Sequence, residues 1–395
     1  MRFWPRRRAA RWGLASALSV AGVVAAGLGT LCAISGCSSI DYLSQSASGH
    51  IRLLAAARPV KDAIADPATP EALRQRLELT QRMRQFAVTE LHEPDNGSYR
   101  SYADLKRPAA VWNVVAAPEL SLNLATWCFP IVGCVGYRGY YDLPSANAAA
   151  EPLKQAGLEV DVYEVPAYST LGWTNWIGGD PLLSTFVQWP EGELSRLMFH
   201  ELAHQVVYAA GDTTFNESFA TAVEHIGSQR WLERNASVEV RVKQALTETR
   251  RDDFHVLVRA WRAKLDAMYR SGIPDADKRV RKAELYAGMR ADYEALKRDK
   301  WGGYKGYDHW FATANNAAIG AQAAYDDQVG AFERLFAAEG SDFDRFYAEV
   351  RRLAALPKPE RDAAMAAYRE PPKTVPVAAP VVAPATPASS VAISG

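Results

Sequence analysis

The sequence predicts an α+β protein in which a small mixed sheet and one motif-bearing helix precede a predominantly helical C-terminal half. Two observations predict this class. Short β-branched or alternating segments lie between residues 111 and 187 and are bounded by turn residues, as strands usually are. From residue 190 onward, leucines and aromatics recur at helical spacing among dense mixed charge.

The chain begins with the features of an export signal. Five arginines precede an apolar run from Trp12 to Ala33, and residues 1–36 contain no acidic side chain. This order of charged and apolar segments is typical of a secretory signal peptide. The run closes with Ile34-Ser-Gly-Cys37, which resembles a bacterial lipobox, so Cys37 is the expected lipidation site. Because the apolar run is long enough to span a bilayer, a transmembrane anchor is the alternative.

Removal of residues 1–36 changes the charge balance. The whole chain has 45 basic and 45 acidic residues, and the removed segment holds five of the basic ones. The remaining chain is therefore negative, which disfavours nucleic acid as a partner. Ser38 and Ser39 follow Cys37. By resemblance to lipoprotein sorting in Gram-negative bacteria, they imply an outer-membrane lipoprotein that faces the periplasm.

Residues 37–370 are expected to form one domain. Two early helices, 41–60 and 70–91, are predicted to pack as a hairpin, and Pro70 suits the first turn of the second helix. The strands of the sheet and a short helix between them are predicted at 111–116, within 121–141, at 148–156 (the helix), at 158–165 and at 180–187.

Cys128 and Cys134 lie in one short segment, Trp127-Cys-Phe-Pro-Ile-Val-Gly-Cys134. Outside the cytoplasm a disulfide between them is expected. Two reduced, buried thiols are the alternative. A zinc site is disfavoured, because five intervening residues are a poor zinc-ligand spacing and no second cysteine pair follows.

The helical half begins with the helix that carries the main motif, predicted from Pro190 to about Ala209. A further helix opens near Asn216 and runs through Val223. The later helices are predicted at 236–271 and 275–299 as an antiparallel hairpin, and then at 313–337 and 341–368. Residues 371–395 are almost uncharged and rich in Pro and Ala, which predicts a disordered tail.

The motif is His200-Glu-Leu-Ala-His204. A spacing of four places both imidazoles on one face of a helix, where a single metal ion can bind both. Glu201 lies beside them and is the expected general base. Zinc is the expected ion, because it prefers imidazole nitrogens and one carboxylate and leaves a position for water.

The third ligand must come from outside the motif. Asn216-Glu-Ser-Phe-Ala220 resembles the Asn-Glu-x-x-Ala element of glutamate-zincin peptidases, which implies Glu217 as the ligand. Only twelve residues separate Glu217 from His204, whereas many glutamate-zincins have about 18 or 19. Glu224 leaves nineteen residues but lacks the Asn-Glu context. Both carboxylates share one helix face, so one can bind the metal while the other supports a ligand.

The wider chain resembles a bacterial lipoprotein family called "putative aminopeptidase". The segments that carry the resemblance are 112–119, 127–134, 137–140, 180–185, 200–205, 215–220, 315–317 and Tyr325. It covers roughly residues 37–370, and it implies a zincin-like catalytic core with an active-site helix, a peptide substrate and aminopeptidase activity.

The expected chemistry is hydrolysis of a peptide bond by metal-activated water. Glu201 would take the proton from the water and pass it to the leaving amine. Zincins often use a Tyr or His to stabilise the oxyanion, and the candidates here are Tyr307, His309 and Tyr325. Asp180 and Ser184 are weaker candidates for aligning the substrate.

Three other functions remain open. The acidic Gly-x-Met-Glu-Asn motif, by which glutamate-zincin aminopeptidases bind a free α-amine, is absent. Endopeptidase activity is therefore one alternative. Hydrolysis of peptidoglycan cross-links is the second, and the third is a non-catalytic envelope lipoprotein in which the metal is structural or absent.

Overall fold

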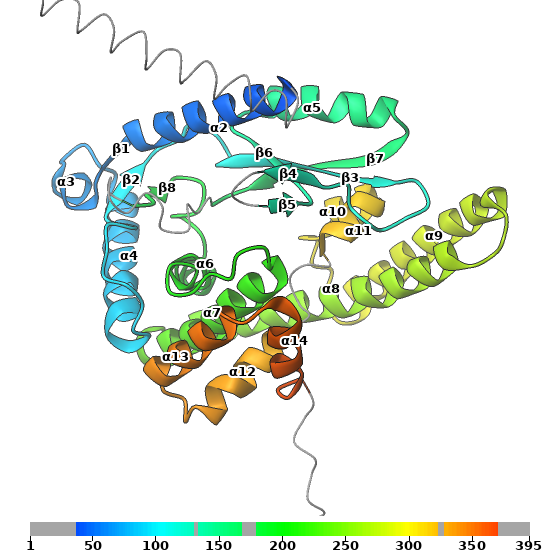
Figure 1. Ribbon diagram of the computed structural model, residues 1–395. Helices are drawn as coiled ribbons and strands as arrows, with labels where there is room; N and C mark the ends of the chain where they lie inside the picture. Colours follow the sequence, from blue (N-terminus) through cyan, green and yellow to red (C-terminus); the bar gives the residue numbers. More distant parts are fainter. Residues whose placement is uncertain (1–36, 130–132, 168–178, 323–327, 370–395) are drawn as a thin grey trace, which may run out of the picture.

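The structure is a computed structural model that describes residues 37–129, 133–167, 179–322 and 328–369 (Figure 1). The expected signal peptide and the expected disordered tail, residues 371–395, lie outside the described residues. Cys37 is the first residue of helix α2 (Cys37–Ala55).

The longer sheet is antiparallel and has the order β6-β3-β7. Its strands are β3 (Val111–Pro118), β6 (Arg138–Tyr140) and β7 (Leu158–Val165). β3 and β7 pair along their whole length, from Val111 opposite Val165 to Pro118 opposite Leu158. The strands predicted at 111–116 and 158–165 are therefore confirmed.

Helices cover both faces of this sheet. Successive side chains of β3 point to opposite faces. Trp112 packs against α5 (Leu143–Gln155), and Val115 packs on the other face against Ala317 of α11 (Asn316–Ala321). Because both faces are buried, β3 is apolar at nearly every position rather than alternating.

A second, mixed sheet has the order β1-β2-β8. β1 (Ala57–Pro59) is antiparallel to β2 (Ser101–Ala103), and β8 (Leu182–Leu183) is parallel to β2. The strand predicted over 180–187 is thus wrong in length. After Leu183 the backbone turns, and the amide of Val187 donates to the Leu183 carbonyl at 3.1 Å.

The segment between β3 and β6 contains a hairpin of β4 (Trp127–Phe129) and β5 (Gly133–Val135). Cys128 and Cys134 lie opposite each other in it and are joined by a disulfide. Short strands were expected in this region, and β4, β5 and β6 confirm them.

The predicted early helical hairpin is wrong. α2 ends at Ala55, and the chain then forms β1 and the separate helix α3 (Val60–Ala65). Proline at 59 explains the break, because a residue before proline is disfavoured in helical conformation. α2 lies along the sheet near α5 (Figure 1), where Tyr42 packs edge-to-face on Tyr140 at 5.7 Å. α4 (Glu71–Glu90) packs instead on α6 and α7.

The largest apolar cluster surrounds the motif helix α6 (Glu191–Ala203). Met198, Phe199 and Leu202 of α6 have no exposed surface. The cluster also contains side chains of α4, α7 (Thr213–Asn235), α12 (Val329–Ala338), α13 (Phe343–Ala354) and α14 (Lys358–Ala366). Since so many elements pack around α6, its position in the molecule is tightly fixed.

The later helices match the sequence prediction in part. α8 (Val238–Arg270) and α9 (Asp275–Asp299) form the expected hairpin, which extends as an arm in Figure 1. The single helix predicted over 313–337 is wrong, because Asn315 caps the new helix α11 by accepting from the Ala318 amide at 3.0 Å. The helix predicted over 341–368 is split at Pro357.

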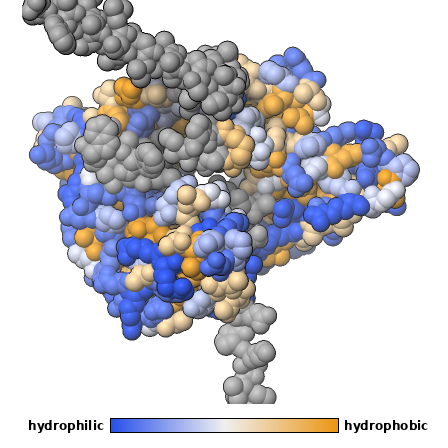
Figure 2. Space-filling model, viewed as in Figure 1, coloured by the Kyte–Doolittle hydropathy of each residue, from blue (hydrophilic) through white to orange (hydrophobic). Residues whose placement is uncertain are grey.

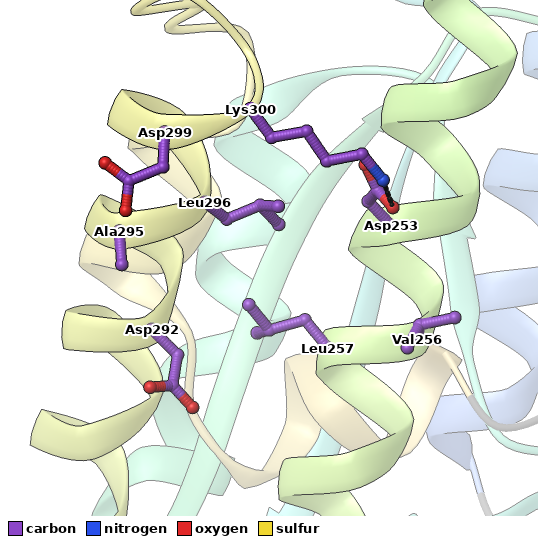
Figure 3. A pocket seen from close by; sticks show the side chains of 8 residues that line it. All are labelled: Asp253, Val256, Leu257, Asp292, Ala295, Leu296, Asp299 and Lys300. Atoms are coloured by element: carbon purple, nitrogen blue, oxygen red, sulfur yellow. Dashed lines mark hydrogen bonds and ion pairs between the residues drawn. The ribbon is translucent and has the colours of Figure 1, made fainter.

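The surface of the α8–α9 arm combines polar and apolar residues (Figure 2). A groove of about 390 Å³ lies between the two helices (Figure 3). Leu257 and Leu296 line it, and Lys300 reaches across to Asp253 at 2.6 Å. None of its lining residues belongs to α6 or α7. In the described part of the chain, no helix is both long and apolar enough to cross a membrane.

Candidate metal centre

The two histidines of the motif lie at the C-terminal end of α6. His204 is the residue that caps the helix, and His200 lies one turn before it. Their ring centroids are 4.8 Å apart, and the two Nε2 atoms are separated by 3.1 Å. His204 is buried and His200 is partly buried. The helical spacing therefore brings both nitrogens to one point, as the sequence predicted.

The motif helix is shorter than predicted, since it ends at Ala203 rather than near Ala209. The amide of Val206 donates to the Ala203 carbonyl, which closes a turn instead of continuing the helix. Asp212 then caps α7 by accepting from the Phe215 amide at 3.3 Å. Only nine residues, 204–212, lie between the two helices.

Asn216 holds this short connection in place. Its side-chain oxygen accepts from the Ala209 amide at 2.7 Å, and its side-chain nitrogen donates to the Ala209 carbonyl at 2.9 Å. Asn216 is 3 % exposed, so both bonds are shielded from water. The asparagine of the Asn-Glu pair thus has a structural role. Asn216 holds the turn by hydrogen bonds, and the turn sets the position of Glu217.

Glu217 completes a group of three ligand atoms. Its carboxylate oxygens lie 3.3 Å from Nε2 of His200 and 3.7 Å from Nε2 of His204. The first distance is to Oε2 and the second is to Oε1, and one ligand atom from each of the three residues lies within 4.8 Å of the others. Around a tetrahedral ion with bonds of about 2.0–2.1 Å, neighbouring ligand atoms are about 3.4 Å apart. His200, His204 and Glu217 can therefore hold one metal ion.

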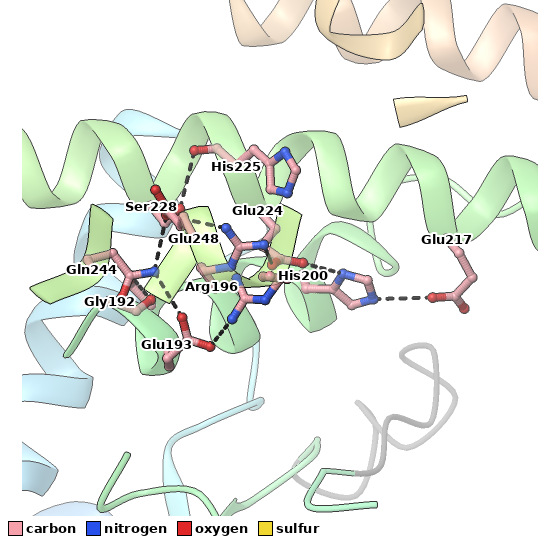
Figure 4. A network of polar contacts seen from close by, with 12 residues as sticks. Gly192, Glu193, Arg196, His200, Glu217, Glu224, His225, Ser228, Gln244 and Glu248 are labelled. Atoms are coloured by element: carbon pink, nitrogen blue, oxygen red, sulfur yellow. Dashed lines mark hydrogen bonds and ion pairs between the residues drawn. The ribbon is translucent and has the colours of Figure 1, made fainter. Parts of the chain in front are cut away.

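Glu224 lies behind His200 rather than beside the ligands. Its Oε2 is 3.0 Å from Nδ1 of His200, and its Oε1 is 2.6 Å from Nη2 of Arg196. Figure 4 shows the His200 ring between the two glutamates, with Arg196 beyond Glu224. Glu224, which the spacing argument offered as the ligand, therefore contacts Nδ1 of His200 and lies outside the group of three. The twelve residues between His204 and Glu217 are enough to bring Glu217 to the two histidines, because α6 ends early.

The close contacts among these buried charged groups shift their pKa values. Burial lowers the pKa of His200, but hydrogen bonds with Glu217 and Glu224 raise it more, so its pKa lies well above the usual value. Burial and the charge of His200 lower the pKa of His204 to about 4. Burial raises the pKa of Glu224, yet Arg196 and His200 bring it down to about 2. Glu224 is thus a carboxylate at neutral pH and accepts from Nδ1 of His200.

Glu201 follows His200 on α6 and is partly exposed. Burial raises the pKa of the Tyr99 phenol well above its usual value, and the negative charge of Glu201 raises it further. The charge of Glu201 also raises the pKa of His200. Glu201 therefore lies within electrostatic range of a ligand without belonging to the group of three.

The other predicted site residues lie elsewhere. Tyr307 stacks on Phe254 of α8 with ring centroids 4.5 Å apart, and His309 is exposed on α10 (Asp308–Thr313). Among the described residues, no contact joins either of them to His200, His204 or Glu217, and their role as oxyanion donors stays a prediction. Tyr325 lies outside the described residues.

Asp180 and Ser184, the two candidates for substrate alignment, make hydrogen bonds to the backbone of neighbouring segments. The Asp180 carbonyl accepts from the Tyr99 amide at 2.7 Å. Ser184 Oγ accepts from the Leu105 amide at 3.0 Å, next to the short pairing of β2 and β8. Both contacts hold backbone segments together.

Two tyrosines near Glu217 were not identified from the sequence. Tyr137 and Tyr208 are each 44 % exposed, and burial, together with the charge of Glu217, raises the pKa of both phenols. Tyr208 lies four residues after His204, which is the only signal in the sequence that could have drawn attention to it. Both phenols are neutral hydrogen-bond donors within electrostatic range of Glu217.

The chain matches the model of a known protein family. No curated protein and no solved structure matches the chain. The model of the family described as "Putative aminopeptidase" matches residues 41–365. This range includes every ligand and supporting residue of the centre. The chain therefore belongs to the "Putative aminopeptidase" family.

Proposed function

We propose that this protein is a zinc-dependent aminopeptidase with a zincin-like core. The observation that carries the proposal is the convergence of His200, His204 and Glu217, whose ligand atoms lie within 4.8 Å of one another, with Glu201 next to His200. Two imidazoles and one carboxylate are the donor set of many catalytic zinc sites, which keep a further position open. Membership of the family supports peptide hydrolysis.

Each residue has a role in the proposed reaction. Zinc held by the three ligands would supply a Lewis acid and acidify the attacking water. Glu201 accepts the proton from that water and later donates it to the leaving amine. A neutral phenol, from Tyr137 or Tyr208, donates to the oxyanion that forms at the peptide carbonyl. Glu224 holds Nδ1 of His200 and leaves its Nε2 for the metal.

Lipid anchoring at Cys37, on the periplasmic face of the outer membrane, is part of the proposal. It is supported by the arginine-rich and apolar segment that precedes Cys37 in the sequence. A Cys37→Ala chain should appear in the soluble periplasmic fraction and fail to incorporate labelled palmitate. Retention of the variant in the outer membrane would favour another mode of attachment.

The decisive experiment is Glu201→Gln. Peptide hydrolysis should fall by about 10²–10⁴-fold, because the general base is lost. Zinc content should stay at one ion per chain, since Glu201 is not one of the three ligands. Unchanged hydrolysis would exclude this mechanism, and a variant that loses its zinc would show that Glu201 has a structural role.

Free and N-acetylated peptides of the same sequence separate the two kinds of peptidase. An aminopeptidase requires the free α-amine, so the acetylated peptide should resist cleavage. Equal cleavage of both peptides would identify an endopeptidase instead.

A further inference from the structure

Arg196 shares a face of α6 with the two histidines of the centre. Arg196, His200 and His204 are spaced by four residues. Side chains at this spacing lie one above another on a helix. α7 presents Glu217 and Glu224 to this face, about 10 Å apart along its axis. The five side chains therefore alternate between the helices, in the order Arg196, Glu224, His200, Glu217 and His204.

The contact between Arg196 and Glu224 is close and shielded from water. The atoms Nη2 and Oε1 are 2.6 Å apart, and the side chains are 10 % and 14 % exposed. A buried carboxylate without a partner would be costly, and replacing a buried ion pair by apolar residues often costs no stability. Stability alone therefore explains the Arg196–Glu224 pair poorly, which points to an effect of the pair on neighbouring residues.

Glu224 uses its two oxygens for different partners. Oε1 binds Arg196, and Oε2 is 3.0 Å from Nδ1 of His200. A carboxylate at Nδ1 keeps the proton on that nitrogen and leaves the Nε2 lone pair available to a metal. In contrast, Nδ1 of His204 has no hydrogen-bond partner among the described residues. Within the described part of the chain, the Arg196–Glu224 pair therefore acts on one of the two histidine ligands.

Helix α8 holds Arg196 from its other side (Figure 4). Nη1 of Arg196 is 3.4 Å from Oε1 of Glu248 on α8. The side chain of Gln244 donates to Glu248 at 3.1 Å and to Glu193 of α6 at 2.9 Å. At Gly192 a Cβ atom would lie 2.1 Å from Gln244 Oε1, so α8 approaches α6 closely here. Arg196 is thus held between α7 and α8 and has little freedom to move.

We infer that Arg196 is a positioning residue of the metal centre: it fixes Glu224, and Glu224 orients the Nε2 of His200 toward the point shared with His204 and Glu217. This inference rests on the proposed function, because it assumes that these ligands bind zinc. It assigns Arg196 no contact with the substrate. The residue acts through Glu224 on the geometry of the ligand set.

Zinc affinity of the full chain tests the inference without any activity measurement. The dissociation constant is measured by competition with a chromophoric chelator for the wild type, Arg196→Met and Arg196→Lys. Arg196→Met should bind zinc about 10–100-fold more weakly, as loss of an outer-shell partner usually does. Arg196→Lys should recover part of the affinity. Lysine restores the charge, but it lacks the planar guanidinium that contacts both Glu224 and Glu248.

Arg251→Met is the matched control. Arg251 pairs with Glu193 in the same network, and no contact joins it to Glu224 or His200 among the described residues. The control removes an equal charge and should leave zinc affinity within about threefold. Cobalt-loaded chains give an independent measurement, because the visible bands of Co²⁺ should shift in Arg196→Met and remain unchanged in Arg251→Met.

The outcomes separate the inference from the proposed function. Wild-type chain that binds neither zinc nor cobalt overturns the proposed function. Tight binding by the wild type, with equal affinity and spectrum in Arg196→Met, overturns only the role of Arg196. Equal losses in Arg196→Met and Arg251→Met also overturn it, since a general effect of charge would then suffice. If Arg196→Met does not fold, Arg196→Lys decides, and wild-type affinity in that variant overturns the inference.

Discussion

Asn216 binds both backbone polar groups of Ala209, the N–H and the C=O, with hydrogen bonds of 2.7 and 2.9 Å. Replacing Asn216 by alanine would leave two buried backbone groups without partners, which costs about 1–3 kcal/mol for each group. The turn from α6 to α7 should loosen, and zinc affinity should fall together with the free energy of unfolding. Urea unfolding and chelator competition measure the two effects.

Asn235→Ala provides the comparison for that variant. Asn235 lies at the other end of α7, where its side chain donates to the Trp231 carbonyl at 3.1 Å. Its loss should change stability by less than about 1 kcal/mol and leave zinc affinity unchanged. Equal zinc affinity in the two variants would mean that the Asn216 contact does not set the position of Glu217.

Glu217→Gln and Glu224→Gln should differ in their effect on metal binding. Glu217 offers its oxygens to the shared point, whereas Glu224 faces Nδ1 of His200. Loss of an anionic ligand should weaken zinc binding more than the roughly 10–100-fold expected for loss of a supporting carboxylate. Titration calorimetry with zinc gives both constants. A larger loss in Glu224→Gln would reverse the two assignments.

Tyr208→Phe and Tyr137→Phe test the donor to the oxyanion. Removal of one such donor typically lowers kcat by about 10²–10³-fold, while KM changes little because the interaction forms in the transition state. One of the two variants should show this pattern. Tyr307→Phe should keep wild-type kcat, because Tyr307 stacks on Phe254 in the helical arm. Wild-type kcat in both Tyr208→Phe and Tyr137→Phe would exclude these phenols.

Glu93 predicts a dependence of stability on pH. It is 3 % exposed, and neither carboxylate oxygen has a hydrogen-bond partner among the described residues. Burial raises the pKa of Glu93 well above its usual value, although Arg84 and His200 lower it. The folded chain thus holds this proton more tightly than the unfolded chain does. Its contribution to stability is present below about pH 4.5 and is lost as pH rises through the folded pKa.

Glu93→Gln should therefore be more stable than the wild type at about pH 8, by more than about 1 kcal/mol, and similar to it at about pH 4. Urea unfolding at the two pH values measures the difference. A gain of the same size at both pH values would attribute the effect to packing instead.

The sequence was sufficient for the motif and insufficient for the third ligand. His200 and His204 are four residues apart, so helix geometry alone predicts their shared face. The choice between Glu217 and Glu224 set the Asn-Glu context of Glu217 against the nineteen-residue spacing of Glu224. The structure ends α6 at Ala203, where Asn216 binds the Ala209 backbone. A contact between two elements leaves no local pattern, so periodicity could not reveal it.

The same reasoning applies to the fold. β7 was predictable to the residue because its apolar and polar residues alternate and because it pairs with β3 along its whole length. β8 was overestimated, since its apolar residues continue into a buried turn whose burial resembles that of a strand. Arg196 and Tyr208 were missed because their importance depends on helices α7 and α8, which pack on α6 from elsewhere in the chain.

The early end of α6 has a further consequence for the affinity of the centre. His200 and His204 occupy its last turn and its cap, where the aligned peptide dipoles of a helix give a partial negative charge of about half an electron. A cation at this point is thus attracted by the backbone itself, before any side-chain ligand is considered. That attraction does not depend on Glu217, so the chain should retain weak affinity for divalent ions even when this carboxylate is removed.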